Sequence, residues 1–477
     1  MILSWLKKKK NSLDLALVMC PGWGVVQPPV GISYLKSFLE KYDTSVRCFD
    51  LSLELYNVFP KKEYWDLNYP EHFITSHMFE RHILPFLNPF IDLWAEQILS
   101  YNPKVVGFSL FMSSLNVSLL LAKRLKEKNP NLVILGGGAE VNRVKRVVVD
   151  GIKRLAALNR DIFSIFDILI DGEGEMTLLE ILSLLKQGRD FHYVDGICYT
   201  SDSKILVNRP RKLIEDLDIL LPPDFCDFKL RNYTRRALPI VTSRGCTNRC
   251  TFCADSPLWK AYRHRSAEKV IEEIKFLIKH YGRNKFEIVD SIFNGDVQRV
   301  EKICDLIMKS GLNIQWSAKA TLRKEMSYAL LRKMKEAGCC SLGYGLESGS
   351  PRVLRDMRKN IDLEEAKRII RDTHKVGIQA NCFFIIGYPT ETEEDFQLTL
   401  NFVKENVGFI HHFEQVTGCH IEEDSYLGLN LDRYGIVLKQ DGWYSKESTP
   451  QIRRQRYDKF RELARKLHKH YKCEVQA

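Results

Sequence analysis

Short apolar runs alternate with helical patterns over the first 190 residues. The apolar runs that predict strands are Leu13–Met19, Val46–Leu51, Val105–Phe111, Leu132–Leu135 and Phe166–Ile170. Val30–Tyr42 and Met176–Leu185 have the three- and four-residue apolar spacing of amphipathic helices. Strands that alternate with helices indicate a parallel sheet covered on both faces, so residues 1–190 are predicted to form a doubly wound, Rossmann-like α/β domain.

Two stretches interrupt this regular pattern. Residues 53–98 are rich in aromatic residues and proline, and they are expected to form a helical insertion. Residues 191–236 contain a predicted hairpin, Gly196–Val207, followed by Pro222-Pro223 and polar residues. The second stretch is therefore expected to link two domains.

A second alternating series begins at Ala237. Its predicted strands are Leu238–Ser243, Phe286–Val289, Ile314–Ala318, Cys340–Leu346, Gln379–Ile386 and Ile410–Val416. Its predicted amphipathic helices cover residues 267–281, 297–310, 327–337, 363–376 and 393–406. Six strands are too few for a closed eight-fold barrel, so residues 237–425 are predicted to form a partial (β/α)6 barrel with its site at the carboxyl ends of the strands. Residues 426–477 are expected to form a helical extension with a basic helix at Ile452–Tyr471.

Composition supports a folded protein and does little to identify a partner. Of 477 residues, 45% are hydrophobic and 27% are charged, which excludes a disordered or low-complexity chain. The net charge of +11 is spread along the chain, with two local peaks at Lys7–Lys10 and at Arg453–Lys472. A solvated basic face is the favoured interpretation, and no aromatic-interleaved basic motif predicts a nucleic-acid partner. The apolar residues before Lys7 give a weak indication of a membrane surface and of a lipid substrate.

The chain shows no secretory signal, because Met1–Leu6 is too short for the apolar region of one. A cytoplasmic location is therefore expected. In that compartment the 13 cysteines are reduced thiols or metal ligands and do not form a disulfide framework.

Three cysteines carry the strongest chemical signal. Cys246, Cys250 and Cys253 form C-x3-C-x2-C directly after a predicted strand. Three thiolates can hold three irons of a 4Fe-4S cluster and leave the fourth iron open for a small molecule. Structural zinc is the alternative, but it prefers four protein ligands, and the next candidate is His264 with no second C-x2-C behind it.

At these residues the chain resembles the radical S-adenosylmethionine (SAM) superfamily. The cysteine spacing, the aromatic Phe252 before the third cysteine and the predicted partial barrel carry the resemblance. It implies a 4Fe-4S cluster that cleaves SAM reductively into methionine and a 5′-deoxyadenosyl radical. It also implies a low-potential electron donor such as flavodoxin or ferredoxin.

The resemblance assigns further residues at the strand ends. Asp290 is the expected contact of the SAM ammonium group, although Asn294 or Asp296 nearby also suits a helix cap. Ser317, Lys319 and Arg323 are expected to hold the ribose and carboxylate of SAM. Glu347 is expected to support the ligand pocket, and Gly387–Thr392 matches the glycine-proline-acid turn of the family, or is simply a turn with a helix cap.

The first domain resembles the cobalamin-binding domain that precedes the barrel in one branch of this superfamily. The segments Pro28–Leu35 and Asp171–Glu175 carry that resemblance. It places the nucleotide tail of cobalamin along the strand ends, near Ser109, Ser113, Gly137, Gly138 and Gly172. The chain lacks the Asp-x-His-x-x-Gly motif that ligates cobalt in many such domains. A nucleotide site, or a domain kept only for packing, are the alternatives.

The expected activity is cobalamin-dependent methylation of an unactivated carbon in a biosynthetic substrate. A radical cyclisation, rearrangement or oxidation with the same cofactors is the second possibility, and a non-catalytic cobalamin or SAM sensor is the third. Methylthiolation is disfavoured because it uses a second cluster, and only Cys20 and Cys48 precede residue 190.

The substrate, a small molecule or a lipid, is expected to meet the sixth strand of the barrel. Its polar candidates are His411, His412, Glu414, Cys419 and His420. About half of them can point inward, because successive side chains of a strand face opposite sides. Cys419 is the expected catalytic thiol, acting as a hydrogen donor or as a thiol behind the residues that touch the substrate.

Overall fold

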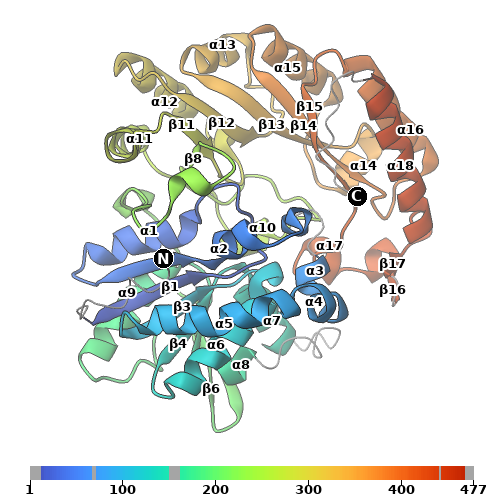
Figure 1. Ribbon diagram of the computed structural model, residues 1–477. Coiled ribbons are helices and arrows are strands. Elements are labelled where there is room, and N and C mark those ends of the chain that lie inside the picture. The colour runs from blue at the N-terminus through green and yellow to red at the C-terminus, as the bar shows by residue number, and fades with distance from the viewer. Residues whose placement is uncertain (1–11, 67–70, 150–161, 440–441, 468–477) are drawn as a thin grey trace. The chain divides into compact units, whose positions relative to one another are not determined.

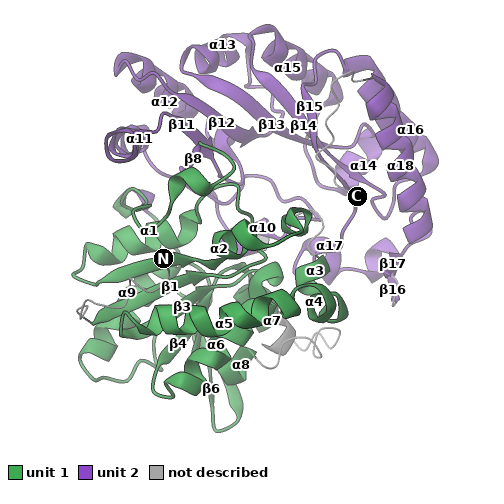
Figure 2. Cartoon of the chain, in the orientation of Figure 1, with its two compact units in different colours: residues 1–215, 219–236 green, residues 216–218, 237–477 purple. Residues whose placement is uncertain are grey.

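The computed structural model describes residues 12–66, 71–149, 162–439 and 442–467 (Figure 1). The chain forms two compact units, which Figure 2 colours separately. Unit 1 comprises residues 1–215 and 219–236, and unit 2 comprises residues 216–218 and 237–477. The Lys7–Lys10 run and the last residues of the predicted C-terminal helix lie outside the described residues.

Unit 1 is built on a seven-stranded sheet with the order β2-β1-β3-β4-β5-β6-β7. The strands are β1 (Leu13–Met19), β2 (Val46–Asp50), β3 (Pro103–Ser109), β4 (Val133–Gly137), β5 (Ile168–Ile170), β6 (Ile197–Ser201) and β7 (Lys204–Val207). The first five are parallel, which confirms the doubly wound prediction. The predicted hairpin is β6 and β7, and it extends this sheet antiparallel to β5.

The position of β1 explains its composition. It pairs with β2 on one side and with β3 on the other, and six of its seven residues are buried. An interior parallel strand is covered on both faces, so a nearly continuous apolar run is expected. β2 lies on one side of β1 and β3 lies on the other, so the strand order reverses at β1. Ligands of such sheets bind at the carboxyl ends of the strands beside this reversal.

Helices surround this sheet. They are α1 (Val30–Glu40), α2 (Leu51–Val58), α3 (Glu71–Ile74), α4 (Ser76–His82), α5 (Leu84–Leu99), α6 (Leu115–Lys128), α7 (Ala139–Val149), α8 (Ile162–Ile165) and α9 (Gly174–Lys186). α1 packs beside α9, and α5 packs beside α6. The predicted helical insertion is confirmed, because α2 to α5 occupy it.

Unit 2 is built on six parallel strands with the order β15-β14-β13-β12-β11-β8. They are β8 (Leu238–Ile240), β11 (Lys285–Ile288), β12 (Gln315–Ala320), β13 (Cys339–Glu347), β14 (Gln379–Ile386) and β15 (His412–Gly418). Each strand neighbours the next in the sequence, so the predicted partial barrel is confirmed. A short antiparallel pair, β9 (Ser243–Arg244) and β10 (Arg263–His264), brackets the cysteine triad, and the sequence pattern did not indicate it.

Crossover helices line the outer side of these strands (Figure 1). They are α11 (Ala267–Tyr281), α12 (Val297–Lys309), α13 (Tyr328–Glu336), α15 (Leu363–Lys375) and α16 (Glu393–Asn406). Tyr344 of β13 shares a hydrogen bond of 2.8 Å with Thr373 of α15. The side chain of Tyr344 therefore lies on the outer face of β13, toward the helices. Alternate residues of β13, such as Ser341 and Gly343, therefore face the interior of the barrel.

The residues after β15 end in a helix that packs against β14, β15 and α16. They form α17 (Tyr426–Leu429), β16 (Val437–Lys439), β17 (Gly442–Tyr444) and α18 (Pro450–Leu467). Arg453 of α18 packs on the turn that follows β14. Its Cγ lies 2.3 Å from the position that a Cβ on Gly387 would take. None of the helices in the described part of the chain is long and apolar enough to cross a bilayer.

Candidate functional site

The three cysteines of the triad lie in the loop between β9 and α10 (Asp255–Trp259), and all three are half-buried. Arg249, inside the triad, donates hydrogen bonds to the backbone carbonyls of Cys246 at 2.8 Å and Lys260 at 2.7 Å. The backbone N–H of Asn248 donates to Sγ of Cys246 at 3.4 Å, and its side chain donates to Oγ1 of Thr321 at 3.3 Å. The loop is thereby closed on itself and bonded to the end of β12.

Thr251 attaches the same loop to the rest of the unit. It is fully buried, and its hydroxyl shares a hydrogen bond of 2.7 Å with Tyr388, just beyond β14. Its N–H donates to the carbonyl of Met357 at 3.0 Å, and its carbonyl accepts from Leu427 at 2.7 Å. Three separate segments therefore fix the backbone between Cys250 and Cys253.

A buried ion pair lies against the triad. Lys359 lies three residues beyond the end of α14 (Pro351–Asp356). It pairs with Glu347 at the end of β13, and both side chains are less than one-tenth exposed. The Lys359 ammonium lies 5.9 Å from the ring centre of Phe252. Gly345 makes room for the pair, since a Cβ there would lie 2.6 Å from both charged groups.

This pair affects the ionisation of the thiols. Burial raises the pKa of Cys250, and the charge of Lys359 opposes that rise. The same two influences act on Cys246. Burial also works against the charge of Lys359, but Glu347 and the neighbouring thiol outweigh it, so the pKa of Lys359 is raised. A buried cation that stays charged favours the thiolates that metal binding needs.

The donor set fits an iron–sulfur cluster. In a cubane each thiolate binds a different iron, so the three sulfurs need not converge on one point. Within the described residues, no three His, Cys, Asp or Glu side chains converge as ligands of one metal ion would. The three half-buried thiols, together with the cation beside them, can hold three irons.

Asp290 lies just beyond β11 and is 2% exposed. Its carboxylate accepts from the backbone N–H of Thr242 at 2.7 Å and from the hydroxyls of Thr242 and Ser243 at 2.6 and 2.7 Å. Burial raises the pKa of Asp290, while the nearby Arg299 lowers it. Asp290 thus holds the backbone that leads into the cysteine loop, and its contact with the SAM ammonium stays a prediction. The helix cap is Asp296, whose side chain accepts from the N–H of Arg299.

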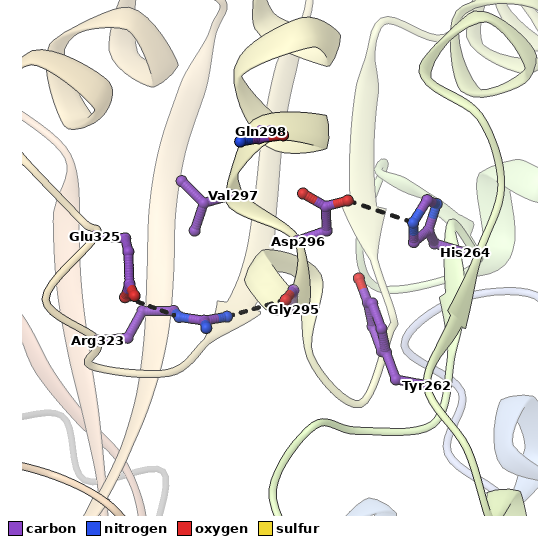
Figure 3. A pocket seen from close by; sticks show the side chains of 8 residues that line it. All are labelled: Tyr262, His264, Gly295, Asp296, Val297, Gln298, Arg323 and Glu325. Carbon is purple, nitrogen blue, oxygen red and sulfur yellow. Dashed lines mark hydrogen bonds and ion pairs between the residues drawn. The ribbon is translucent and has the colours of Figure 1, made fainter.

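The other predicted SAM residues lie on or after the strands next to Asp290. Ser317 and Lys319 are on β12, and both alternate with buried residues that face the helices. Arg323 lines a surface pocket with seven other residues (Figure 3): Tyr262, His264, Gly295, Asp296, Val297, Gln298 and Glu325. Its guanidinium donates to the carbonyls of Asn294 and Gly295 at 2.9 and 3.0 Å. These residues share one edge of the barrel, and their contacts with SAM stay predictions.

Cys419, the predicted catalytic thiol, is 4% exposed and lies in an apolar cluster with Tyr388, Leu427 and Trp443. Burial raises the pKa of this thiol far above its usual range. This is the environment of a core side chain, and the hydrogen-donor role stays a prediction. Of the other candidates on this strand, Glu414 is exposed on the interior side of the barrel, where Asn381 bonds it.

Unit 1 brings the predicted cobalamin residues to one edge of its sheet. Ser109 and Gly137 are the last residues of β3 and β4, which are adjacent strands. Gly138 and Gly172 have φ of +113° and +90°, which favours glycine. Ser113 follows β3, and its carbonyl oxygen would lie 2.1 Å from a Cβ on Gly22, so the loops after β1 and β3 touch.

The acidic side chains after β5 interact with other residues of unit 1. Asp171 forms an ion pair with Lys145, and Glu173 accepts from the backbone N–H of Ile214 at 2.7 Å. At the same edge Trp23 stacks on Phe111, with ring centres 4.0 Å apart. The sequence pattern did not predict this aromatic pair. Gly172 is exposed, and no heavy atom lies within 4 Å of a Cβ built there, so a ligand can approach the backbone closely.

Comparison with known proteins agrees with this geometry. The family model described as the radical SAM superfamily matches residues 240–403. An uncharacterized methyltransferase from Pyrococcus horikoshii is 30% identical over 315 residues, covering 65% of this chain and 66% of the relative. An anaerobic magnesium-protoporphyrin IX monomethyl ester cyclase from Rubrivivax gelatinosus is 27% identical over 66% of this chain and 56% of the relative. The chain therefore spans less than two thirds of the length of these relatives.

One solved structure shares the fold over nearly the whole chain. It is the radical SAM methyltransferase TsrM from Kitasatospora setae, with cobalamin and a [4Fe-4S] cluster bound. The TM-score is 0.67 at 16% identity, over 90% of this chain and 81% of that one. At that identity the likeness is one of fold.

Proposed function

The chain belongs to the radical SAM superfamily, and from that premise we propose that it is a cobalamin-dependent radical SAM enzyme that methylates an unactivated carbon of a biosynthetic substrate. The observation that carries the proposal is the anchored cysteine loop at the end of a parallel barrel, in a chain whose first unit has the fold of a cobalamin-bound methyltransferase. When bound, the cluster with SAM supplies a carbon radical that removes a hydrogen atom, and cobalamin supplies a transferable methyl group.

The chain's own residues would position these groups. Cys246, Cys250 and Cys253 would hold three irons and leave the fourth to SAM. Lys359 would offset the negative charge that three thiolates bring into a half-buried loop. Glu347 keeps that ammonium in place, so the pair sets the electrostatics of the pocket without leaving either charge unpaired.

The assignment of the SAM ligands extends the proposal. Ser317, Lys319 and Arg323 would bind the ribose and carboxylate from one edge of the barrel, by hydroxyl and charge-assisted bonds. Asp290 supports them by holding Thr242 and Ser243 ahead of the cysteine loop. Ser109, Ser113, Gly137, Gly138 and Gly172 would line the cobalamin edge of unit 1, where exposed glycine backbone allows close approach.

A second candidate function is radical cyclisation with the same cofactors. One relative carries the name of a cyclase, and nothing in the triad separates the two reactions. Methylation adds one methyl group to the product, whereas cyclisation does not. The mass of the product therefore distinguishes them.

The first test is cofactor content. We expect anaerobically purified protein, supplied with hydroxocobalamin, to bind about one corrinoid and about four irons per chain. Reduced protein should form 5′-deoxyadenosine from SAM and transfer a labelled SAM methyl group to its substrate. Iron without corrinoid would overturn the cobalamin assignment, and a triple Cys→Ala variant with normal iron would overturn the cluster assignment.

A further inference from the structure

Three polar side chains are joined across the interior face of the barrel. Ser341 lies on β13, Asn381 on β14 and Glu414 on β15. The amide nitrogen of Asn381 donates to Oγ of Ser341 and to Oε2 of Glu414, at 3.0 Å in each case. The three side chains are therefore linked by one amide group.

Their orientation follows from the strand pattern. Tyr344 reaches outward to α15, so Ser341 is on the opposite, interior face of β13. Asn381 is bonded to Ser341, which places its side chain on that same face. Glu414 follows the outward-buried Phe413 and is itself exposed. The group lies inside the barrel, in the amino-terminal halves of the three strands, and Glu414 is exposed there.

The direction of the amide is settled by its neighbours. An ionised carboxylate only accepts hydrogen bonds, so the NH2 group of Asn381 must face Glu414. The amide oxygen then points elsewhere. It is buried and has no hydrogen-bond partner within the described structure, and the residue as a whole is only 7% exposed. A buried acceptor without a partner is costly, and such groups call for a ligand or an ordered water.

Gly343 leaves room for the side chains of Phe383 and Glu414 to pack beside this acceptor. Gly343 lies between Lys319 and Asn381 in the register of the sheet. A Cβ on Gly343 would lie 2.7 Å from the ring of Phe383 and 3.4 Å from the carboxylate of Glu414. Lys319 is the cation in that register, yet among the described contacts it forms no ion pair with Glu414. Among the residues that the structure describes, no lysine or arginine is paired with this carboxylate, whose hydrogen-bond partner is Asn381.

We propose that Asn381 and Glu414 form a recognition site for a protonated amine of the substrate, with Ser341 fixing the amide. An ammonium group donates up to three hydrogen bonds and carries the charge that a carboxylate prefers, so it satisfies the amide oxygen and Glu414 together. A carboxylate or phosphate would meet repulsion, and an alkyl group would leave the amide oxygen unpaired. The inference rests on the proposed function, since it concerns the molecule on which the radical acts.

Simple probes can test this site without knowledge of the substrate. The probes are n-butylamine, butyrate and 1-butanol, each examined at millimolar concentration by saturation-transfer NMR with the reconstituted full-length protein. We expect the amine alone to bind. Glu414→Gln and Asn381→Leu should weaken it by about tenfold or more, since each removes one charged or polar partner.

The matched control is Glu336→Gln, which removes an exposed carboxylate paired with Arg332 on α13. It should bind the amine like the unmodified protein. Binding of butyrate or butanol as tight as that of the amine, amine binding that survives Glu414→Gln, or no binding of any probe would each overturn the inference. Deoxyadenosine formation is measured separately without any amine, so failure of this site and failure of the proposed function are distinguishable.

Discussion

The hydroxyl of Thr251 and the hydroxyl of Tyr388 are 2.7 Å apart, which joins the cysteine loop directly to the end of β14. The bond is buried on both sides, and Tyr388 also donates to the carbonyl of Asp356 at 3.2 Å. The position of the second and third cysteines therefore depends on a strand that comes much later in the chain.

Tyr388→Phe removes both of these hydrogen bonds and keeps the ring. We expect a loss of about 1 to 3 kcal/mol in the free energy of unfolding and lower iron content after reconstitution, because the buried Thr251 hydroxyl keeps only its 3.4 Å hydrogen bond to the carbonyl of Asp356. Chemical denaturation and an iron assay measure the two effects. Tyr328→Phe, at an exposed residue of α13, is the control. Equal iron content in the two variants would contradict the anchoring role.

Lys359→Met leaves Glu347 buried and unpaired. We expect destabilisation by roughly 3 to 5 kcal/mol, together with reconstitution that requires a higher pH, since the thiols lose the cation that lowers their pKa. The double variant Glu347→Gln with Lys359→Met should regain stability but not the pH range of cluster assembly. If both variants load iron at the same pH as the unmodified protein, Lys359 has no influence on the thiols.

Asp290→Asn tests a positioning role against a direct SAM contact. The amide cannot accept from Thr242 and Ser243 as the carboxylate does, so we expect about 1 to 3 kcal/mol of destabilisation and reduced iron loading. The affinity of the loaded fraction for SAM, measured by calorimetry, is the second readout. A tenfold loss there would reveal a contact with SAM, and an unchanged affinity leaves Asp290 as support for the loop alone.

Glu391 predicts a pH dependence of stability. Burial raises the pKa of Glu391 from 4.5 to about 7. The folded state thus holds a proton that the unfolded state has released between pH 4.5 and 7, so stability falls as the pH rises through this range and stays low above it. We expect Glu391→Gln to be more stable than the unmodified protein at pH 8, by up to roughly 3 kcal/mol, with a flatter profile from pH 4.5 to 7. A profile as steep as before would show that another group titrates.

Gly172 allows a matched test of the cobalamin edge. Gly172 and Gly188 both have positive φ, and no heavy atom lies within 4 Å of a Cβ at either residue. An alanine at either position should cost a similar amount, about 1 kcal/mol, from backbone strain. We expect only Gly172→Ala to weaken hydroxocobalamin binding, measured by titration of the corrinoid spectrum. Equal affinities in the two variants would remove Gly172 from the cobalamin site.

The architecture could be predicted from the sequence because each strand and helix is encoded locally. Strand β1 was predicted with the bounds it has, and α11 likewise, since apolar runs and helical periodicity need only neighbouring residues. The cysteine triad was visible for the same reason, as three ligands of one cluster lie within one loop.

What the sequence could not reveal depends on contacts between distant segments. Lys359 belongs to no motif, and its importance comes from Glu347 and the thiols that the fold brings beside it. The orphaned oxygen of Asn381 depends on three strands at once. Asp290 was noticed at a strand end, but its neighbours Thr242 and Ser243 belong to a different strand end. Side-chain partners of this kind follow from tertiary packing, which local patterns do not specify.

The packing of Arg453 against Gly387 has a consequence for the order of events during synthesis. All three cysteines have left the ribosome before Met357, Tyr388 or Leu427, the partners of Thr251, is translated. Helix α18, which packs on the turn at Gly387, is translated later still. A nascent chain therefore exposes the thiols on a loop without anchors. We expect cluster insertion to follow release of the finished chain, and ribosome-bound chains that end before Arg453 to bind iron poorly.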